Sequence, residues 1–142
     1  MLIEIINLTK LRVNKKYFQK IGEVVLRKLK QPKDAEVSLV FVGDAQMKSL
    51  NKKYRGINKA TDVLSFIYNE NNFLGEIVIS VPTAKKQAAK RSYPLKTELS
   101  ELFTHGLLHL VGYEDETQAG YSRMLKKQKN ILAFLGFSAT NN

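Results

Sequence analysis

The stretch "HGLLHLVGYED", residues 105–115, contains the only two histidines of the chain. His105 and His109 are four residues apart, and on a helix this spacing places both imidazoles on one side, about 40° apart around the axis. The chain has no cysteine, so a metal site here would depend on His, Asp or Glu side chains. An isolated histidine pair at this spacing is more often structural, and the neighbouring residues must decide between the two interpretations.

The residues that follow the histidines favour a metal site. Gly112 lies where a left-handed glycine would end the helix and turn Glu114 and Asp115 back toward the histidines. The spacing follows the extended zinc-hydrolase pattern H-E-x-x-H-x-x-G-x-x-H with two differences. Gly106 replaces the glutamate that serves as general base in zinc peptidases, which argues against peptide hydrolysis. Asp115 replaces the third histidine.

Asp115 can preserve the site because a carboxylate oxygen and an imidazole nitrogen bind zinc at similar distances. A carboxylate lowers the net charge of the site by one, so water bound to the metal becomes less acidic. We therefore expect one zinc ion at His105, His109 and Asp115, held more weakly than by three histidines, with Mn²⁺ as an alternative. Glu101 precedes His105 by four residues, where it could orient that ring or form a surface pair.

Composition indicates one domain, residues 1–142, with 44% hydrophobic residues to form its core. The formal net charge of +10 suggests a polyanionic partner such as nucleic acid, although a lysine-rich surface can equally serve solubility. No apolar run is long enough to span a bilayer, so we expect a cytoplasmic protein without a membrane partner.

Hydrophobic periodicity predicts nine elements in the order strand, helix, strand, helix, strand, strand, helix, helix, helix. Strands are expected at 2–6, 36–43, 62–68 and 73–80, and helices at 14–30, 44–56, 83–93, 96–112 and 119–136. Asn14, Asp44 and Thr97 are the expected helix N-caps. This order predicts a single α+β domain, in which helices pack on a mixed sheet of short strands and one helix carries a zincin-like metal site.

The stretch at 105–115 resembles the signature H-G-x-L-H-L-x-G-Y-D-H of the YbeY endoribonucleases. Glu114 stands in place of the signature's Asp, and Asp115 in place of its third zinc-binding His. "LNKKYRG" (50–56), "TDVLSF" (61–66) and "LGEIVIS" (74–80) are similar to further motifs of that family, in the same order, and Met124 lies in the last expected helix. On these motifs the chain is identified as a member of the family.

This resemblance implies a single-strand-specific, metal-dependent endoribonuclease that matures the 3′ end of 16S (small-subunit) ribosomal RNA and takes part in ribosome quality control. It implies ribosomal RNA and the small ribosomal subunit as partners, and no small-molecule cofactor is evident. His105 and His109 correspond to zinc ligands, Asp115 occupies the third ligand position, and Arg55 corresponds to the family's functionally important arginine.

Physical roles can be assigned to the residues around these motifs. Arg55 offers a planar fork suited to phosphate, although a surface arginine at a helix end is the simpler alternative. Thr61 and Asp62 are expected to hold the turn before a strand, and Tyr113 to pack beneath its loop. Glu114 is the nearest candidate for a general base. The expected RNA-binding surface consists of Lys52, Lys53, Lys85, Lys86, Lys90 and Arg91.

Two other functions compete with the nuclease hypothesis. A metal-free RNA-binding or ribosome-binding factor of the same fold would result if Asp115 had abolished metal binding. A metallopeptidase fits the zincin-like spacing but lacks the glutamate that Gly106 replaces.

Overall fold

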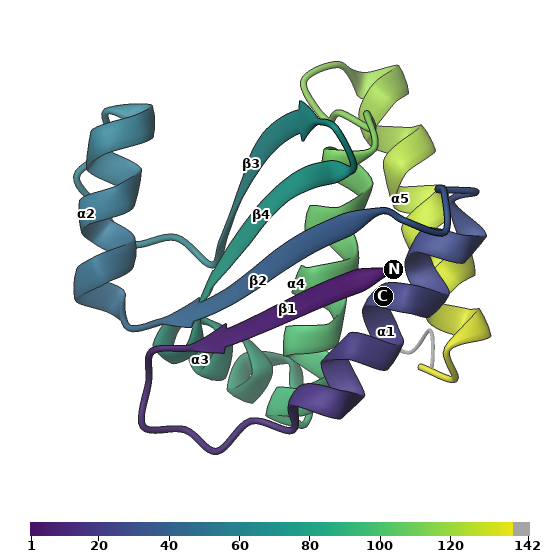
Figure 1. Cartoon of the computed structure of the whole chain (residues 1–142). Helices are drawn as coiled ribbons and strands as arrows, with labels where there is room; N and C mark the ends of the chain where they lie inside the picture. Colours follow the sequence, from purple (N-terminus) through teal and green to yellow (C-terminus); the bar gives the residue numbers. More distant parts are fainter. Residues whose placement is uncertain (138–142) are drawn as a thin grey trace.

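Four strands form one mixed sheet in the computed structural model, which describes residues 1–137 (Figure 1). The strand order is β1-β2-β4-β3. Strands β1 (Leu2–Asn7), β2 (Glu36–Val42) and β4 (Phe73–Ser80) are parallel, and β3 (Val63–Glu70) pairs with β4 in the antiparallel sense. The expected mixed sheet is therefore confirmed, with β1 and β3 as its two edge strands.

Five helices surround this sheet. They are α1 (Lys15–Lys28), α2 (Asp44–Arg55), α3 (Val81–Arg91), α4 (Leu95–Leu110) and α5 (Gln118–Phe134). The predicted α+β class and the predicted order of elements are confirmed, and the bounds differ by a few residues. Asn14 caps α1 as expected, because its side-chain oxygen accepts a hydrogen bond from the main-chain N–H of Tyr17. None of the helices within residues 1–137 is both long and apolar enough to cross a bilayer.

The main core lies between one face of the sheet and helices α1 and α4. Alternate residues of β2 point into it, because successive strand side chains face opposite sides. Phe41 of β2 packs edge-on against Phe18 of α1, with ring centroids 5.3 Å apart. Leu99, Phe103 and Leu107 of α4 are almost fully buried here, each burial contributing about 2 kcal/mol. Residues on the flank of this α4 stripe consequently lie at the margin of the core.

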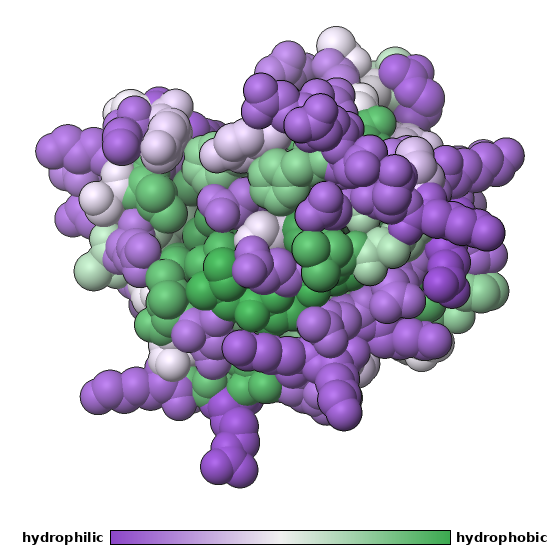
Figure 2. All heavy atoms as spheres, viewed as in Figure 1, coloured by the Kyte–Doolittle hydropathy of each residue, from purple (hydrophilic) through white to green (hydrophobic). Residues whose placement is uncertain are grey.

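The opposite face of the sheet is covered only in part. Met47 of α2 is fully buried there against Val40 and Val42 of β2, Leu64 of β3 and Val78 of β4. Figure 1 shows α2 at the left side of the sheet, and Figure 2 shows apolar surface over the strands beside it. Each strand carries one glutamate and none carries a lysine or arginine, so the basic residues lie on helices and connecting segments.

Two of the expected caps are wrong. Asp44 is the first residue of α2, and its carboxylate accepts hydrogen bonds from the hydroxyls of Ser80 at 2.6 Å and Thr83 at 2.7 Å. These bonds lower the pKa of Asp44 and tie α2 to the start of α3. Thr97 lies in the first turn of α4, which begins after Pro94. Local patterns missed both, since the partners of Asp44 come from a distant segment and Pro94 starts α4 without a side-chain cap.

Candidate metal centre and cleft

The C-terminus of α4 turns the chain back toward the histidines. Gly112 has a φ of 107°, which favours glycine, and its N–H donates to the carbonyl of His109 at 3.1 Å. The N–H of Tyr113 donates to the carbonyl of Leu108 at 3.0 Å. This pair of bonds is the Schellman termination, so the predicted role of Gly112 is confirmed. The reversal brings Asp115 back to the side of α4 that carries the histidines.

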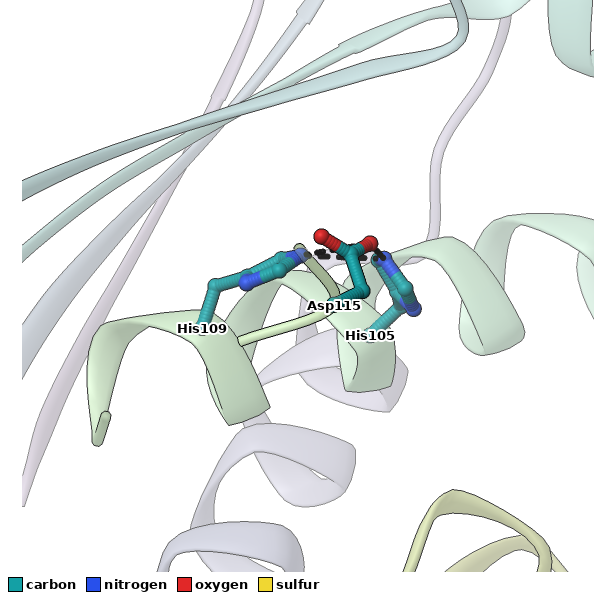
Figure 3. Close-up of side chains that lie close together, drawn as sticks. All are labelled: His105, His109 and Asp115. Carbon is teal, nitrogen blue, oxygen red and sulfur yellow. Dashed lines mark hydrogen bonds and ion pairs between the residues drawn. The ribbon is translucent and has the colours of Figure 1, made fainter. Parts of the chain in front are cut away.

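Three potential ligand atoms converge at this point (Figure 3). The Nε2 atoms of His105 and His109 are 3.2 Å apart. The Oδ2 atom of Asp115 lies 3.6 Å from Nε2 of His109 and 4.0 Å from Nε2 of His105. Both imidazoles are about one-quarter exposed, with side-chain exposures of 28% and 24%, while the Asp115 side chain is 42% exposed. The group therefore opens to solvent on the side of the aspartate.

Hydrogen bonds on the far side of each ring determine where its lone pair points. Nδ1 of His109 lies 3.0 Å from the carbonyl oxygen of Tyr113, and a carbonyl only accepts, so this nitrogen donates. Nδ1 of His105 lies 2.9 Å from the side-chain oxygen of Gln128 and donates to it. Burial lowers the pKa of His105, which keeps its ring neutral at pH 7. In the neutral form both rings direct a bare Nε2 toward Asp115.

This arrangement fits a divalent cation. Bare imidazole nitrogens 3.2 Å apart beside a carboxylate repel one another unless a positive charge lies between them. In tetrahedral coordination with bonds of about 2.0 Å, zinc ligand atoms are about 3.3 Å apart, close to the observed 3.2 to 4.0 Å. Two imidazoles and one carboxylate also form a known catalytic zinc set with one position open.

The three residues lie in a cleft of about 480 Å³ between α4 and β3. Arg55, at the C-terminus of α2, lines the same cleft together with residues from the start of β3. The complete lining is Arg55, Thr61, Asp62, Val63, Leu64, Ser65, Ile67, His105, His109, Asp115 and Glu116. The structure thus brings Arg55 and the expected metal ligands into one cavity.

The turn before β3 is held as expected. Asp62 accepts hydrogen bonds from the main-chain N–H of Val63 at 2.7 Å and from the hydroxyl of Thr61 at 3.4 Å. Its second oxygen accepts from the amide of Gln87 on α3 at 3.3 Å. Since Asp62 also lines the cleft, the bond from Gln87 ties α3 to the cleft wall.

The expected role of Glu101 beside His105 is wrong. Glu101 faces the interior, where it and Glu98 lie 3.6 Å and 3.5 Å from the guanidinium of Arg91. Burial raises the pKa of both carboxyl groups. The helical spacing placed Glu101 near the ring of His105, but α3 covers this part of α4 and supplies Arg91 instead.

Glu114, the candidate for a general base, does not line the cleft. Its carboxylate accepts a hydrogen bond from the hydroxyl of Thr117 at 3.3 Å, at the start of α5, and it lines a separate hollow. Glu116, two residues later, lines the cleft instead. Tyr113 packs against the main core beneath this loop, as expected.

Gly106 is required by packing. A Cβ atom at this position would lie 2.8 Å from a methyl carbon of Ile77 in β4, so α4 and the sheet meet too closely for a larger side chain. A glutamate here, in the position used by zinc peptidases, would have no room and would face the core rather than the cleft. This contact argues against the metallopeptidase hypothesis.

The six expected RNA-binding residues lie on α2 and α3, which contact each other. All six are exposed, and none of them lines the cleft. Arg91 is shared with the buried pair Glu98 and Glu101. Their contact with RNA stays a prediction.

A model of the family described as Endoribonuclease YbeY matches residues 4–136 of the chain. The chain belongs to the YbeY endoribonuclease family. Among its curated YbeY relatives, the Endoribonuclease YbeY of Desulforamulus reducens is 46% identical over 115 residues, covering 74% of this chain and 75% of the relative. That of Moorella thermoacetica is 45% identical over 116 residues, covering 72% and 74% respectively. TM1509 from Thermotoga maritima, known from a solution structure, aligns over 99% of both chains with a TM-score of 0.62 and 25% identity.

Two residues of this YbeY-family site were not found from the sequence. Gln128 contacts His105 from α5, and Glu116 lines the cleft from the loop before α5. Their positions depend on how α5 packs against α4, and no local pattern reports that packing.

Proposed function

We propose that this chain is a metal-dependent endoribonuclease that cleaves single-stranded ribosomal RNA. Its cellular role would be maturation of the 3′ end of small-subunit ribosomal RNA and ribosome quality control. The observation that carries the proposal is the convergence of His105, His109 and Asp115 in a cleft that also contains Arg55. The name shared by its relatives supports RNA as the substrate.

The two histidines and Asp115 would hold one zinc or manganese ion. When bound, the ion activates a water molecule and neutralises phosphate charge. Arg55 binds the non-bridging oxygens of the scissile phosphate through its guanidinium N–H groups, which match phosphate geometry. Glu116 is the cleft carboxylate for which, within residues 1–137, no hydrogen bond or ion pair is found, so it can accept the proton of the attacking water.

The volume of the cleft and the net charge of the protein support a single-stranded polyanion as substrate. A cleft of about 480 Å³ holds roughly one nucleotide, whereas a duplex is far wider. The chain has a net charge of +10, and its exposed lysines on α2 and α3 attract the phosphate backbone over long distances. These features fit ribosomal RNA and the small ribosomal subunit as partners.

One experiment tests the proposal directly. Purified protein is stripped of metal with a chelator, and cleavage of a single-stranded RNA and its duplex is measured before and after adding zinc or manganese. We expect cleavage of the single strand only, and only with metal. His109→Ala, which removes one ligand, should remain inactive at every metal concentration.

The competing function is a metal-free RNA-binding factor, and the exposure of Asp115 is the observation that favours it. That function predicts wild-type protein without bound metal, with RNA affinity unchanged by the chelator and no cleavage. This result would reject the nuclease proposal.

A further inference from the structure

Gln128 of α5 contacts the ring of His105 on the side away from the cleft. Its side-chain oxygen lies 2.9 Å from Nδ1 of His105, across 23 positions of sequence. Gln128 is half-buried and does not line the cleft, so it reaches the site only through this histidine.

The contact matters because an imidazole binds a metal through a nitrogen that carries no proton. In a neutral ring, the hydrogen bond made by one nitrogen decides which nitrogen keeps the proton. The amide oxygen of Gln128 accepts only, so it retains the proton of His105 on Nδ1 and leaves Nε2 bare. That Nε2 atom is the one directed at His109 and Asp115.

The two histidines differ in how this orientation is secured. His109 donates to the main-chain carbonyl of Tyr113, which any side chain at that position would preserve. His105 depends on one side chain from another helix. The orientation of His105 is therefore the part of the site that a single substitution outside the cleft can remove.

We propose that Gln128 is a positioning residue for the metal centre: it sets the protonated nitrogen and the ring orientation of His105 so that Nε2 is available as a ligand. This inference rests on the proposed function, because it requires that the site bind a metal. It also assigns α5 a role in the site beyond packing.

The test compares zinc dissociation constants, measured by competition with a coloured chelator. Gln128→Met keeps the length of the side chain and replaces the amide oxygen by a thioether sulfur, which accepts hydrogen bonds only weakly, so we expect its zinc Kd to rise about 10- to 100-fold. Gln128→Glu keeps an acceptor, and its Kd should not rise. Gln118→Met makes the same exchange at an exposed position of α5 and should leave the Kd unchanged.

A second measurement separates orientation from stability. Nitrogen NMR of the metal-free protein at about pH 8, where imidazoles are neutral, should show His105 protonated on Nδ1, and Gln128→Met should shift that proton toward Nε2. The melting temperature of metal-free Gln128→Met should equal that of the wild type. A parallel fall in melting temperature and zinc affinity would assign Gln128 to packing and overturn the inference.

The outcomes also separate this inference from the proposed function. If the wild type binds zinc and Gln128→Met binds it equally well, the role of Gln128 is refuted and the metal centre stands. If the wild type binds no metal, the metal centre itself is refuted, and the role proposed for Gln128 falls with it.

Discussion

Replacement of Arg55 by alanine should abolish most RNA cleavage while leaving the fold intact. Arg55 is an exposed residue at the end of α2, so its removal should change the free energy of unfolding by less than about 0.5 kcal/mol. Its guanidinium can make two charge-assisted hydrogen bonds to the phosphate, each contributing about 1.5 kcal/mol in an open cleft. Losing about 3 kcal/mol from the transition state lowers the rate about 100-fold.

The assay is single-turnover cleavage of a short single-stranded RNA with saturating metal. Arg55→Lys keeps the charge but loses the planar fork, so it should cleave about tenfold faster than Arg55→Ala. Lys52→Ala and Lys53→Ala are matched controls, because both lysines are exposed on α2 outside the cleft. They should weaken RNA binding in a salt-dependent way and leave the rate at saturation unchanged. If Arg55→Ala cleaves at the wild-type rate, Arg55 is only a surface residue and the reasoning fails.

The other predictions concern the acidic groups of the site and the core. Asp115→His should tighten zinc binding about tenfold, since zinc prefers the softer imidazole donor to a half-exposed carboxylate; weaker binding in chelator competition would remove Asp115 from the ligand position. Glu116→Gln should lower kcat about 100-fold whereas Glu114→Gln should not, and equal effects in the cleavage assay would contradict a base in the cleft. Burial raises the pKa of Glu98 and Glu101, so the stability that these groups contribute is present at low pH and is lost as pH rises through the raised values. In urea unfolding, Glu98→Gln should therefore gain stability relative to the wild type as pH increases, and a difference independent of pH would contradict this.

Much of the local structure could be predicted because it depends on short-range pattern. The apolar stripe of α4 placed His105 and His109 at its flank, and Gly112 ended the helix in the left-handed conformation. The turn at Asp62 was predicted from the tendency of aspartate to bond nearby main chain. The predictions for Asp44 and Glu101 failed because partners distant in the sequence bind these carboxylates, Ser80 and Thr83 for Asp44 and Arg91 for Glu101. Glu114 failed for a local reason, since it accepts a hydrogen bond from Thr117 three residues later, and Thr97 failed because α4 begins two residues before it.

The sequence by itself determined the chemistry that is available: two histidines on one side of a helix, a glycine that reverses the chain, and an aspartate at the third position. It also determined the family, because several motifs occur in order. Only the tertiary structure placed Arg55 in the same cleft as the histidines, since that position depends on β3 pairing with β4 and on the packing of α2. It also brought Gln128 to His105 and excluded any larger side chain at Gly106. Spacing along one helix is fixed by covalent geometry, whereas contacts between elements arise only when the sheet and helices bury their apolar faces together.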